Sequence, residues 1–372
     1  MKLVCIIPTL EGGGAERVMA ALCSQLTQRE HQVTLITLDG GGNERHQVDP
    51  SVKRIWLGVM GQQSGRFGRL TGFWRRILTL RKAIKDEQPD VVLAFCDQMN
   101  ITSLIATTRL GIAVVISERS DPRQQKLPRI WENLRRLTYR KAAKVIVLSE
   151  PIAEYLATTC HAKVVVIPSA IDTPDAMSDR ALAVNNQQII AMGRLEWEKG
   201  FDRLIDAFTE VADSHPDWTL KILGEGSQRP QLEKQISKAD LANRISMPGW
   251  RQTPWKELNS ATFFVLPSRY EGFPSALMET MARGIPSLAV DCDSGPREII
   301  HTVSAGSPDD CAALLVGNDL PNLKYGLKKM INDASEREQI GILGKSIVNH
   351  YSWSTMTDAY ERELNLASLK SR

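Results

Sequence analysis

Residues 2–38 read KLVCIIPTLEGGGAERVMAALCSQLTQREHQVTLITL, in the order strand, glycine turn, helix and strand. The apolar runs Lys2–Leu10 and Gln32–Leu38 predict the two strands, and Ala15–Arg29 has the periodicity of the helix between them. A helix that connects two neighbouring strands makes those strands parallel. The stretch therefore predicts an α/β fold built on a parallel sheet.

The same alternation continues along the whole chain. Further strands are expected at Val52–Leu57, Asp90–Phe95, Ala113–Glu118, Lys144–Leu148, Lys163–Pro168, Gln188–Met192, Thr219–Leu223, Arg244–Met247, Phe263–Leu266 and Ser287–Val290. Helices of the first half are expected at Thr71–Lys85, Ile101–Leu110 and Leu127–Lys141. The pattern predicts two tandem, Rossmann-like, doubly wound sheets.

The length of 372 residues suits two domains, and a polar interval with Pro174 separates the two runs of strands. We expect a first domain at residues 1–171, a linker at 172–187 and a second domain at 188–350. A helical tail, 351–372, follows and can return to the first domain.

Composition narrows the class of protein. The apolar fraction of 42% and the charged fraction of 24% are those of a globular protein. No apolar run approaches the ~18 residues of a membrane-spanning helix, and the opening Leu3–Leu10 is too short for a secretory signal. The six cysteines are scattered without a CxxC pair, which predicts reduced, buried thiols in a cytosolic protein.

Charge is divided unevenly between the two halves. Residues 1–170 hold 24 Lys and Arg against 15 Asp and Glu, while the remainder holds 22 against 28. A basic half indicates that this part of the protein binds an anionic surface or a polyanionic ligand.

Three motifs carry candidate chemistry. PTLEGGGAER, residues 8–17, joins a strand to a helix through three glycines. This pattern fits either a phosphate-binding loop or a plain βα turn without a ligand. MGRLEWEKG, residues 192–200, places Arg194 and Lys199 after a strand, where they form a diphosphate clamp or two solvated charges.

The third motif is PSRYEGFPSALMETMARGIPSLA, residues 267–289. Pro274 predicts a helix start, so the first turn offers free N–H groups. Glu271 precedes that turn and Glu279 lies about one turn inside the helix. A carboxylate can accept hydrogen bonds from both hydroxyls of a ribose, although a glutamate pair at this spacing is often surface charge.

The ordered set GGGAER, GRLxxxKG, YEGFPxxLMExMAxGxP and SGPREII resembles the family 4 retaining glycosyltransferases of the GT-B fold. The resemblance runs over nearly the whole chain. It implies two Rossmann-like domains facing a central cleft, the first for the acceptor and the second for a nucleotide-sugar. It also implies transfer of a hexose or N-acetylhexosamine from a nucleotide-diphosphate donor, with UDP as the usual nucleotide.

By that resemblance, Arg194, Lys199 and Glu271 are the catalytic residues. It assigns donor binding to Gly193, Gly249, Trp250, Gly272, Phe273, Pro274, Ser275, Ala276, Leu277 and Glu279. It assigns the phosphate side and the acceptor to Gly13, Gly14 and Arg17. No cofactor or metal is expected, and the six histidines form no ligand cluster.

One position departs from the family. Many members carry a histidine that reaches the sugar after the fifth strand, where this chain reads AVVISERSDPR with Glu118 and Arg119. A subset that acts on lipid-linked acetamido sugars has a similar I-S-E stretch. Either Arg119 supplies the sugar contact or that contact is absent.

The segment RFGRLTGFWRRILTLRKAIK, residues 66–85, has seven Lys and Arg and no acid, with Phe67, Leu70 and Trp74 among its apolar residues. A second basic stretch spans 119–144. A basic amphipathic helix indicates contact with an anionic bilayer, although its apolar side also packs on the sheet. We expect a peripheral protein on the cytoplasmic face of the bacterial inner membrane and a lipid-linked glycan acceptor. No nucleic-acid motif is present.

Two other functions fit parts of the pattern. A nucleotide-sugar epimerase would share the two-domain shape but needs acid and base groups around the sugar C2, and the motifs nominate none. A non-catalytic sugar-nucleotide or lipid-binding module would lack Arg194, Lys199 or Glu279, and all three are present. Donor hydrolysis with and without a lipid-linked acceptor separates the three functions.

Overall fold

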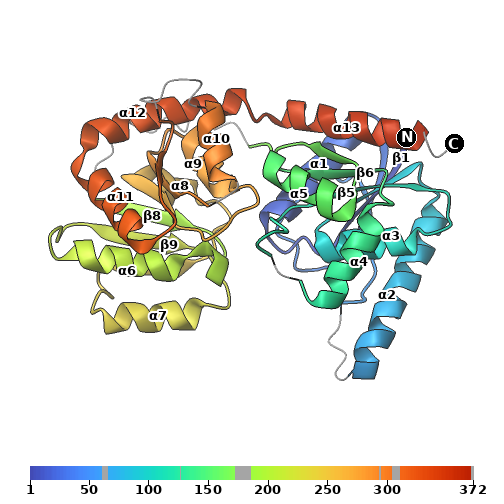
Figure 1. Cartoon of the computed structure of the whole chain (residues 1–372), viewed down its shortest axis with the longest axis horizontal. Coiled ribbons are helices and arrows are strands. Elements are labelled where there is room, and N and C mark those ends of the chain that lie inside the picture. The colour runs from blue at the N-terminus through green and yellow to red at the C-terminus, as the bar shows by residue number, and fades with distance from the viewer. Residues whose placement is uncertain (61–65, 126, 172–185, 293–294, 304–310, 370–372) are drawn as a thin grey trace. The chain divides into compact units, whose positions relative to one another are not determined.

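The computed structural model describes residues 1–60, 66–125, 127–171, 186–292, 295–303 and 311–369, with 66–70 as backbone only. The chain divides into two compact units. Unit 1 holds Met1–Ala170 and Trp353–Arg372, and unit 2 holds Ile171–Ser352 (Figure 1). The predicted linker lies almost entirely outside the described residues, as do Ser294 and the side chains of Phe67 and Leu70.

Unit 1 is built on a seven-stranded sheet in the order β3-β2-β1-β4-β5-β6-β7, and every pair of neighbours is parallel. Its strands are β1 Lys2–Ile7, β2 Gln32–Thr37, β3 Lys53–Trp56, β4 Val91–Phe95, β5 Ala113–Ser117, β6 Lys144–Val147 and β7 Val164–Val166. Its helices are α1 Gly14–Gln28, α2 Arg66–Glu87, α3 Asp97–Ala106, α4 Arg129–Tyr139, α5 Glu150–Cys160 and α13 Trp353–Leu369. The order reverses between β1 and β4, as in a doubly wound sheet.

Both faces of this sheet are buried, because successive strand residues point to opposite faces. Leu3, Cys5 and Ile7 pack under α1 and α13, while Val4 and Ile6 pack under α2, α3 and α5. The strands are therefore continuous apolar runs, as parallel strands covered on both sides must be.

Helix α13 completes one face of unit 1, beside α1 (Figure 1). Tyr360, fully buried, shares a 3.0 Å hydrogen bond with the hydroxyl of Ser117 on β5. The carboxylate of Glu361 binds Arg29 and His31, each at 2.7 Å. The last helix of the chain thus contributes core to the first unit.

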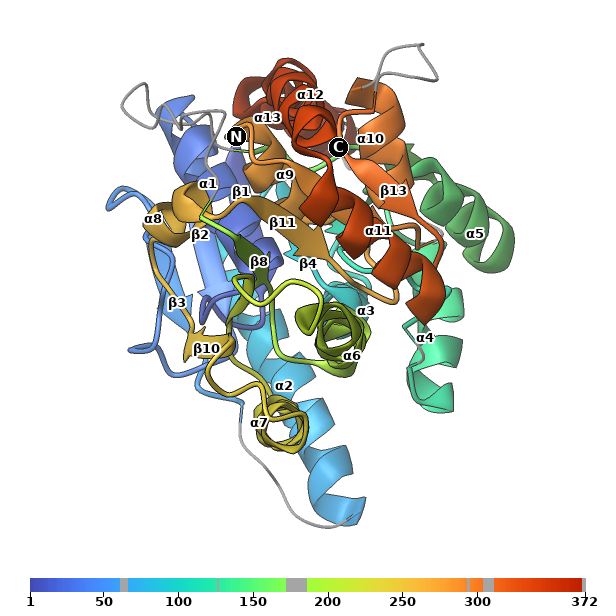
Figure 2. The ribbon, with the colours of Figure 1, turned by 90° about the vertical axis from the view of Figure 1, so that its left-hand side faces the viewer.

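Unit 2 has a six-stranded parallel sheet in the order β10-β9-β8-β11-β12-β13. Its strands are β8 Gln188–Met192, β9 Thr219–Leu223, β10 Ile245–Gly249, β11 Phe263–Leu266, β12 Ser287–Val290 and β13 Leu314–Val316. Its helices are η2 Trp197–Lys199, α6 Phe201–Ala212, α7 Arg229–Lys238, α8 Trp255–Ser260, α9 Ser275–Ala282, α10 Pro296–Val303, α11 Leu320–Asn332, α12 Ala334–Gly344 and η3 Lys345–Asn349. Helices α6 and α9 cover opposite faces of β8 and β11 (Figure 2).

The prediction of two doubly wound, parallel-sheet folds is confirmed. Several predicted bounds were wrong, among them the start of α3, which is Asp97 rather than Ile101. Strand β1 stops at Ile7 because Pro8 follows it, β10 reaches Gly249 through an irregular register after Ser246, and β13 was not predicted. Within the described residues, the helices are all too short or too polar to cross a membrane.

Candidate active site

In unit 2 the strand order reverses between β8 and β11, and ligands of doubly wound sheets bind where the order reverses, beyond the carboxyl ends of the strands. The loop after β8 carries Gly193–Gly200, and the loop after β11 carries Pro267–Pro274. The topology therefore brings two of the predicted motifs together.

A bidentate ion pair joins these two loops. The Lys199 ammonium donates to both carboxylate oxygens of Glu271, at 2.8 and 2.9 Å, and the hydroxyl of Ser268 donates to the first oxygen at 2.6 Å. Glu271 is only 6% exposed, and Lys199 keeps 21% of its side chain exposed. A charged pair held this way is rigid, and its ammonium still faces solvent on one side. Ser268 lies within the quoted motif but was not predicted as a site residue.

Arg194 differs from Lys199 in its exposure. Its side chain is 66% exposed and makes a 3.2 Å ion pair with Glu198, one turn further along the loop. Such an exposed pair is weak, so the guanidinium can leave it for a stronger anion. Gly200 ends the loop at φ 67°, and its α-carbon lies against the carbonyl of Pro267, so a side chain would collide there.

A second ion pair braces the β11 loop. Arg269 binds both oxygens of Asp202, at 2.8 and 2.6 Å, and its guanidinium lies 4.6 Å from the ring centre of Trp197. Burial alone would raise the pKa of Asp202, but Arg269 outweighs it and the pKa lies below the usual value. Sequence reasoning missed this brace, because only the fold brings residues 202 and 269 together.

Helix α9 begins at Ser275, directly after Pro274 as predicted, and no side chain caps its start. Its first backbone bond runs from the N–H of Met278 to the carbonyl of Pro274. The N–H groups of the first turn are thus oriented out of the helix, where they favour an anion. Glu279, 5% exposed, lies one turn further in, on a helix anchored in the core by Leu277.

The backbone turns around this site interlock. Gly224, at φ 141°, has its α-carbon against the carbonyl of Gly193, and its N–H donates to Gly249 at 3.0 Å. Gly249 has φ 91° and precedes Trp250, which is 36% exposed. Gly295, at φ 85°, packs against Pro274. The positive φ angles of Gly224, Gly249 and Gly295 favour glycine at these three turns.

The glycine loop of unit 1 follows the carboxyl end of β1. Gly12 has φ 123°, Gly13 precedes α1 without a side-chain cap, and Gly14 is the first helical residue. The N–H of Arg17 donates to the carbonyl of Gly13 at 3.1 Å. Burial and the charge of Arg17 lower the pKa of the neighbouring His46. The loop is therefore a helix start with both the cation of Arg17 and the carboxylate of Glu16 close to it.

Glu118 and Arg119, at the carboxyl end of β5, make internal contacts. Glu118 is fully buried, accepts a 2.7 Å hydrogen bond from Tyr139 and lies 4.0 Å from Arg135. Burial raises its pKa.

Arg119 binds the hydroxyls of Ser169 at 2.5 Å and Tyr360 at 3.4 Å, and its guanidinium lies over Phe95. These contacts give both residues a structural role, and a contact from Arg119 to the sugar stays a prediction.

Among the described residues, no group of three or more His, Cys, Asp and Glu is placed to hold a metal ion.

The model of Glycosyltransferase Family 4 matches residues 12–174, and the model of Glycosyl transferases group 1 matches residues 172–346. The chain belongs to the family 4 glycosyltransferases. It is thus an enzyme with the GT-B fold.

Several relatives of this chain are named as bacterial glycosyltransferases. It is 26% identical, over 91% of both chains, to a Campylobacter jejuni α-1,4-N-acetylgalactosaminyltransferase named for a diphospho-undecaprenol-linked saccharide. It is also 26% identical to the lipopolysaccharide 1,6-galactosyltransferase of Escherichia coli, over 81% of this chain and 82% of that one. Staphylococcus aureus TarM, solved with UDP, fondaparinux and α-GlcNAc-glycerol, has a TM-score of 0.79 at 13% identity, covering 98% and 99% of the two chains.

Proposed function

We propose that this glycosyltransferase moves a hexose or N-acetylhexosamine from a UDP-sugar to a lipid-linked saccharide, with retention of the anomeric configuration, in bacterial cell-surface glycan synthesis. The observation that carries the proposal is the Lys199–Glu271 pair beside the uncapped start of α9. A cation and a helix N-terminus in one place suit a leaving diphosphate. UDP is the common donor nucleotide of the family, and the TarM structure contains it.

Each donor group has a proposed partner. Arg194, Lys199, Gly193 and the first turn of α9 bind the diphosphate, and Glu279 binds the ribose hydroxyls. The turn at Gly249 and Trp250 flanks the base. In unit 1, the glycine loop contacts the donor phosphates and the acceptor through Gly13, Gly14 and Arg17. A screen of sugar nucleotides against extracted lipid-linked saccharides, read by mass spectrometry, tests the donor and the acceptor together, and finding no transfer to any lipid-linked saccharide contradicts the proposal.

Transfer should survive an excess of EDTA. The reason is that Arg194 and Lys199 supply the positive charge that Mg²⁺ supplies in metal-dependent transferases. The measurement is the initial rate with and without chelator, using a metal-dependent transferase as the control that must lose activity. Loss of transfer that Mg²⁺ or Mn²⁺ restores contradicts this role of the two cations.

Retention is expected to proceed by displacement on one face of the sugar, without a covalent intermediate. The carboxylate of Glu271 already accepts hydrogen bonds from Lys199 and Ser268. It is therefore a poor nucleophile toward the anomeric carbon, but it is well fixed as a hydrogen-bond acceptor for the sugar hydroxyls. Glu271→Gln keeps the side-chain shape and one acceptor oxygen, and should leave weakened but measurable transfer. A covalent mechanism would need a carboxylate close to the anomeric carbon.

Two measurements decide between these mechanisms. Proton NMR of the product should show the anomeric configuration of the donor, and peptide mass spectrometry after a fluorinated donor should show an unmodified Glu271. An inverted product or a glycosyl adduct on Glu271 would refute the proposal. Glu338→Gln, an exposed position on α12, is the matched control and should transfer at the normal rate.

Helix α2 supports the proposed contact with the inner membrane. Its buried side consists of Ile77, Leu80 and Ile84, which pack on the sheet, but Trp74 and Leu78 on another side are 52% and 62% exposed. Exposed apolar side chains among cations are typical of a helix that lies in a bilayer interface.

Replacing the exposed cations Arg75, Lys82 and Lys85 by serine should therefore release the protein from anionic vesicles. Each contributes roughly 1 kcal/mol near such a surface, so binding should weaken by about 100-fold at low salt and differ less at high salt. Vesicle sedimentation measures the effect.

The matched control removes three exposed lysines of unit 2, Lys234, Lys238 and Lys328. It should bind vesicles as the unchanged protein does. Equal binding by both triple variants would mean that α2 is only a packed helix.

A further inference from the structure

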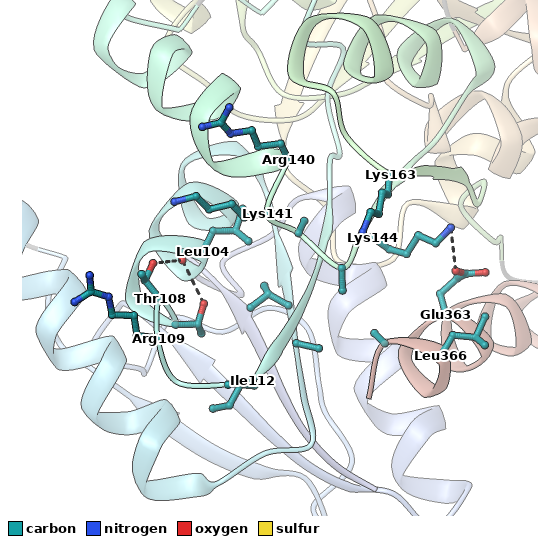
Figure 3. A pocket seen from close by; sticks show the side chains of 17 residues that line it. Leu104, Thr108, Arg109, Ile112, Arg140, Lys141, Lys144, Lys163, Glu363 and Leu366 are labelled. Carbon is teal, nitrogen blue, oxygen red and sulfur yellow. Dashed lines mark hydrogen bonds and ion pairs between the residues drawn. The ribbon is translucent and has the colours of Figure 1, made fainter. Parts of the chain in front are cut away.

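A basic cavity lies in unit 1 at the edge of the sheet where β5 and β6 begin, the opposite edge from the glycine loop after β1 (Figure 3). Its volume is about 640 Å³, which is within the range of small-molecule sites. Its walls come from the turn after α3, the turn between α4 and β6, the residue before β7 and the last turns of α13.

Five cations line the cavity, against one carboxylate. The cations are Arg109, Arg140, Lys141, Lys144 and Lys163, and the carboxylate is Glu363. Lys144 is 3.7 Å from Glu363, and the other four cations make no ion pair with any described residue. Unpaired like charges around one cavity repel each other, so an anion bound there would relieve that repulsion.

Helix dipoles explain only some of this charge. Arg140 and Lys141 follow the last turn of α4, where a cation offsets the negative helix end. Lys163 likewise follows the end of α5 by three residues, whereas Lys144 opens β6, five residues after α4 ends. Arg109 has the left-handed φ of 62°, a conformation that costs a non-glycine residue free energy.

The floor of the cavity is apolar. Leu104, Val114 and Ala142 are buried there, and Leu366 on α13 lines the wall with 46% of its surface exposed. A cationic rim over an apolar floor suits a ligand with a phosphate group and an apolar or neutral part.

The geometry points to a second ligand site in this enzyme, a cavity of unit 1 that binds a phosphate-bearing molecule at the edge of the sheet opposite the glycine loop. The phosphate lies among Arg109, Arg140, Lys141 and Lys163, and the group esterified to it lies over Leu104 and Ala142. The ligand is either a soluble phosphate ester or the headgroup of an anionic phospholipid, since both present the same chemistry. This site is independent of the proposed transfer reaction.

Two variants of the full chain test it. Arg140→Ser with Lys141→Ser removes charge from the rim, while Thr108→Trp, at an exposed rim position, fills the mouth without changing charge. Lys234→Ser with Lys238→Ser is the charge-matched control in unit 2. Thermal unfolding shows that each variant is folded.

The first arm measures binding of sn-glycerol 3-phosphate by calorimetry. Binding that weakens about tenfold or more in both cavity variants, but not in the control or in Lys199→Ala, identifies a soluble phosphate ester. The second arm measures sedimentation with vesicles of phosphatidylglycerol in phosphatidylcholine. Loss of vesicle binding in both cavity variants, without binding of glycerol phosphate, identifies a lipid headgroup. If the cavity variants bind both glycerol phosphate and vesicles as the unchanged protein does, the cavity is not a ligand site. The same holds if binding weakens only in the variant that removes charge.

Discussion

Replacing Lys199 by alanine should lower kcat by about 100-fold or more, because the ammonium stabilises negative charge that grows on the leaving diphosphate. The same substitution leaves the buried Glu271 without its cation, so thermal unfolding must be measured beside the rate. Arg194→Ala provides the clean comparison, since Arg194 is 66% exposed and its ion pair with Glu198 is therefore weak. It should lose activity without losing stability.

The control for both is Lys238→Ala, an exposed lysine on α7. Its kcat should equal that of the unchanged enzyme. Near-normal turnover in both Lys199→Ala and Arg194→Ala would remove the diphosphate clamp from the mechanism. A decrease confined to Lys199→Ala, matched by a lower unfolding temperature, would assign Lys199 a purely structural role.

Glu279→Gln should raise KM for the donor by about 10- to 100-fold and change kcat little, because ribose hydrogen bonds are present both before and during transfer. Glutamine keeps the volume of this nearly buried side chain, and the guanidinium of Arg283 donates to the backbone oxygen of residue 279, which the substitution leaves in place.

A donor that lacks a ribose hydroxyl sharpens this test. The 2′-deoxy donor should bind the unchanged enzyme weakly. With this donor, Glu279→Gln should weaken binding little further, since the hydroxyl that Glu279 would bind is already absent. Glu338→Gln is again the control. Equal, additive losses from the substitution and from the deoxy donor would show that Glu279 does not bind the ribose.

Most of the sheet could be predicted from sequence because strands buried on both faces are continuous apolar runs. The predicted ranges Gln188–Met192, Thr219–Leu223 and Phe263–Leu266 are those of β8, β9 and β11. The edge strand β13 was not predicted because its three residues, Leu314–Val316, are too few to form a recognisable apolar run. Strand β10 extended beyond its prediction because Pro248 sits at an irregularity rather than ending the strand.

Motif spacing nominated Lys199 and Glu271 separately, but their pairing depends on the neighbouring positions of β8 and β11, 72 residues apart in sequence. The internal contacts of Arg119 were equally hidden, because Tyr360 comes from the far end of the chain. Local patterns reveal which residues follow a strand, and only the assembled sheet shows which of them meet.

The last helix has a consequence for the order in which the protein can mature. During synthesis, domains generally fold as they emerge, the first one first. Here the first unit cannot complete its core early, because Met356, Tyr360 and Leu364 of α13 are part of that core and are translated after the whole of unit 2. While the second unit emerges, the part of this sheet face formed by β4 and β5 lacks its covering helix, and Phe95 and Val115 are left without their packing partners on α13. Synthesis of α13, rather than completion of the first 170 residues, is therefore the step after which the first unit can fold fully.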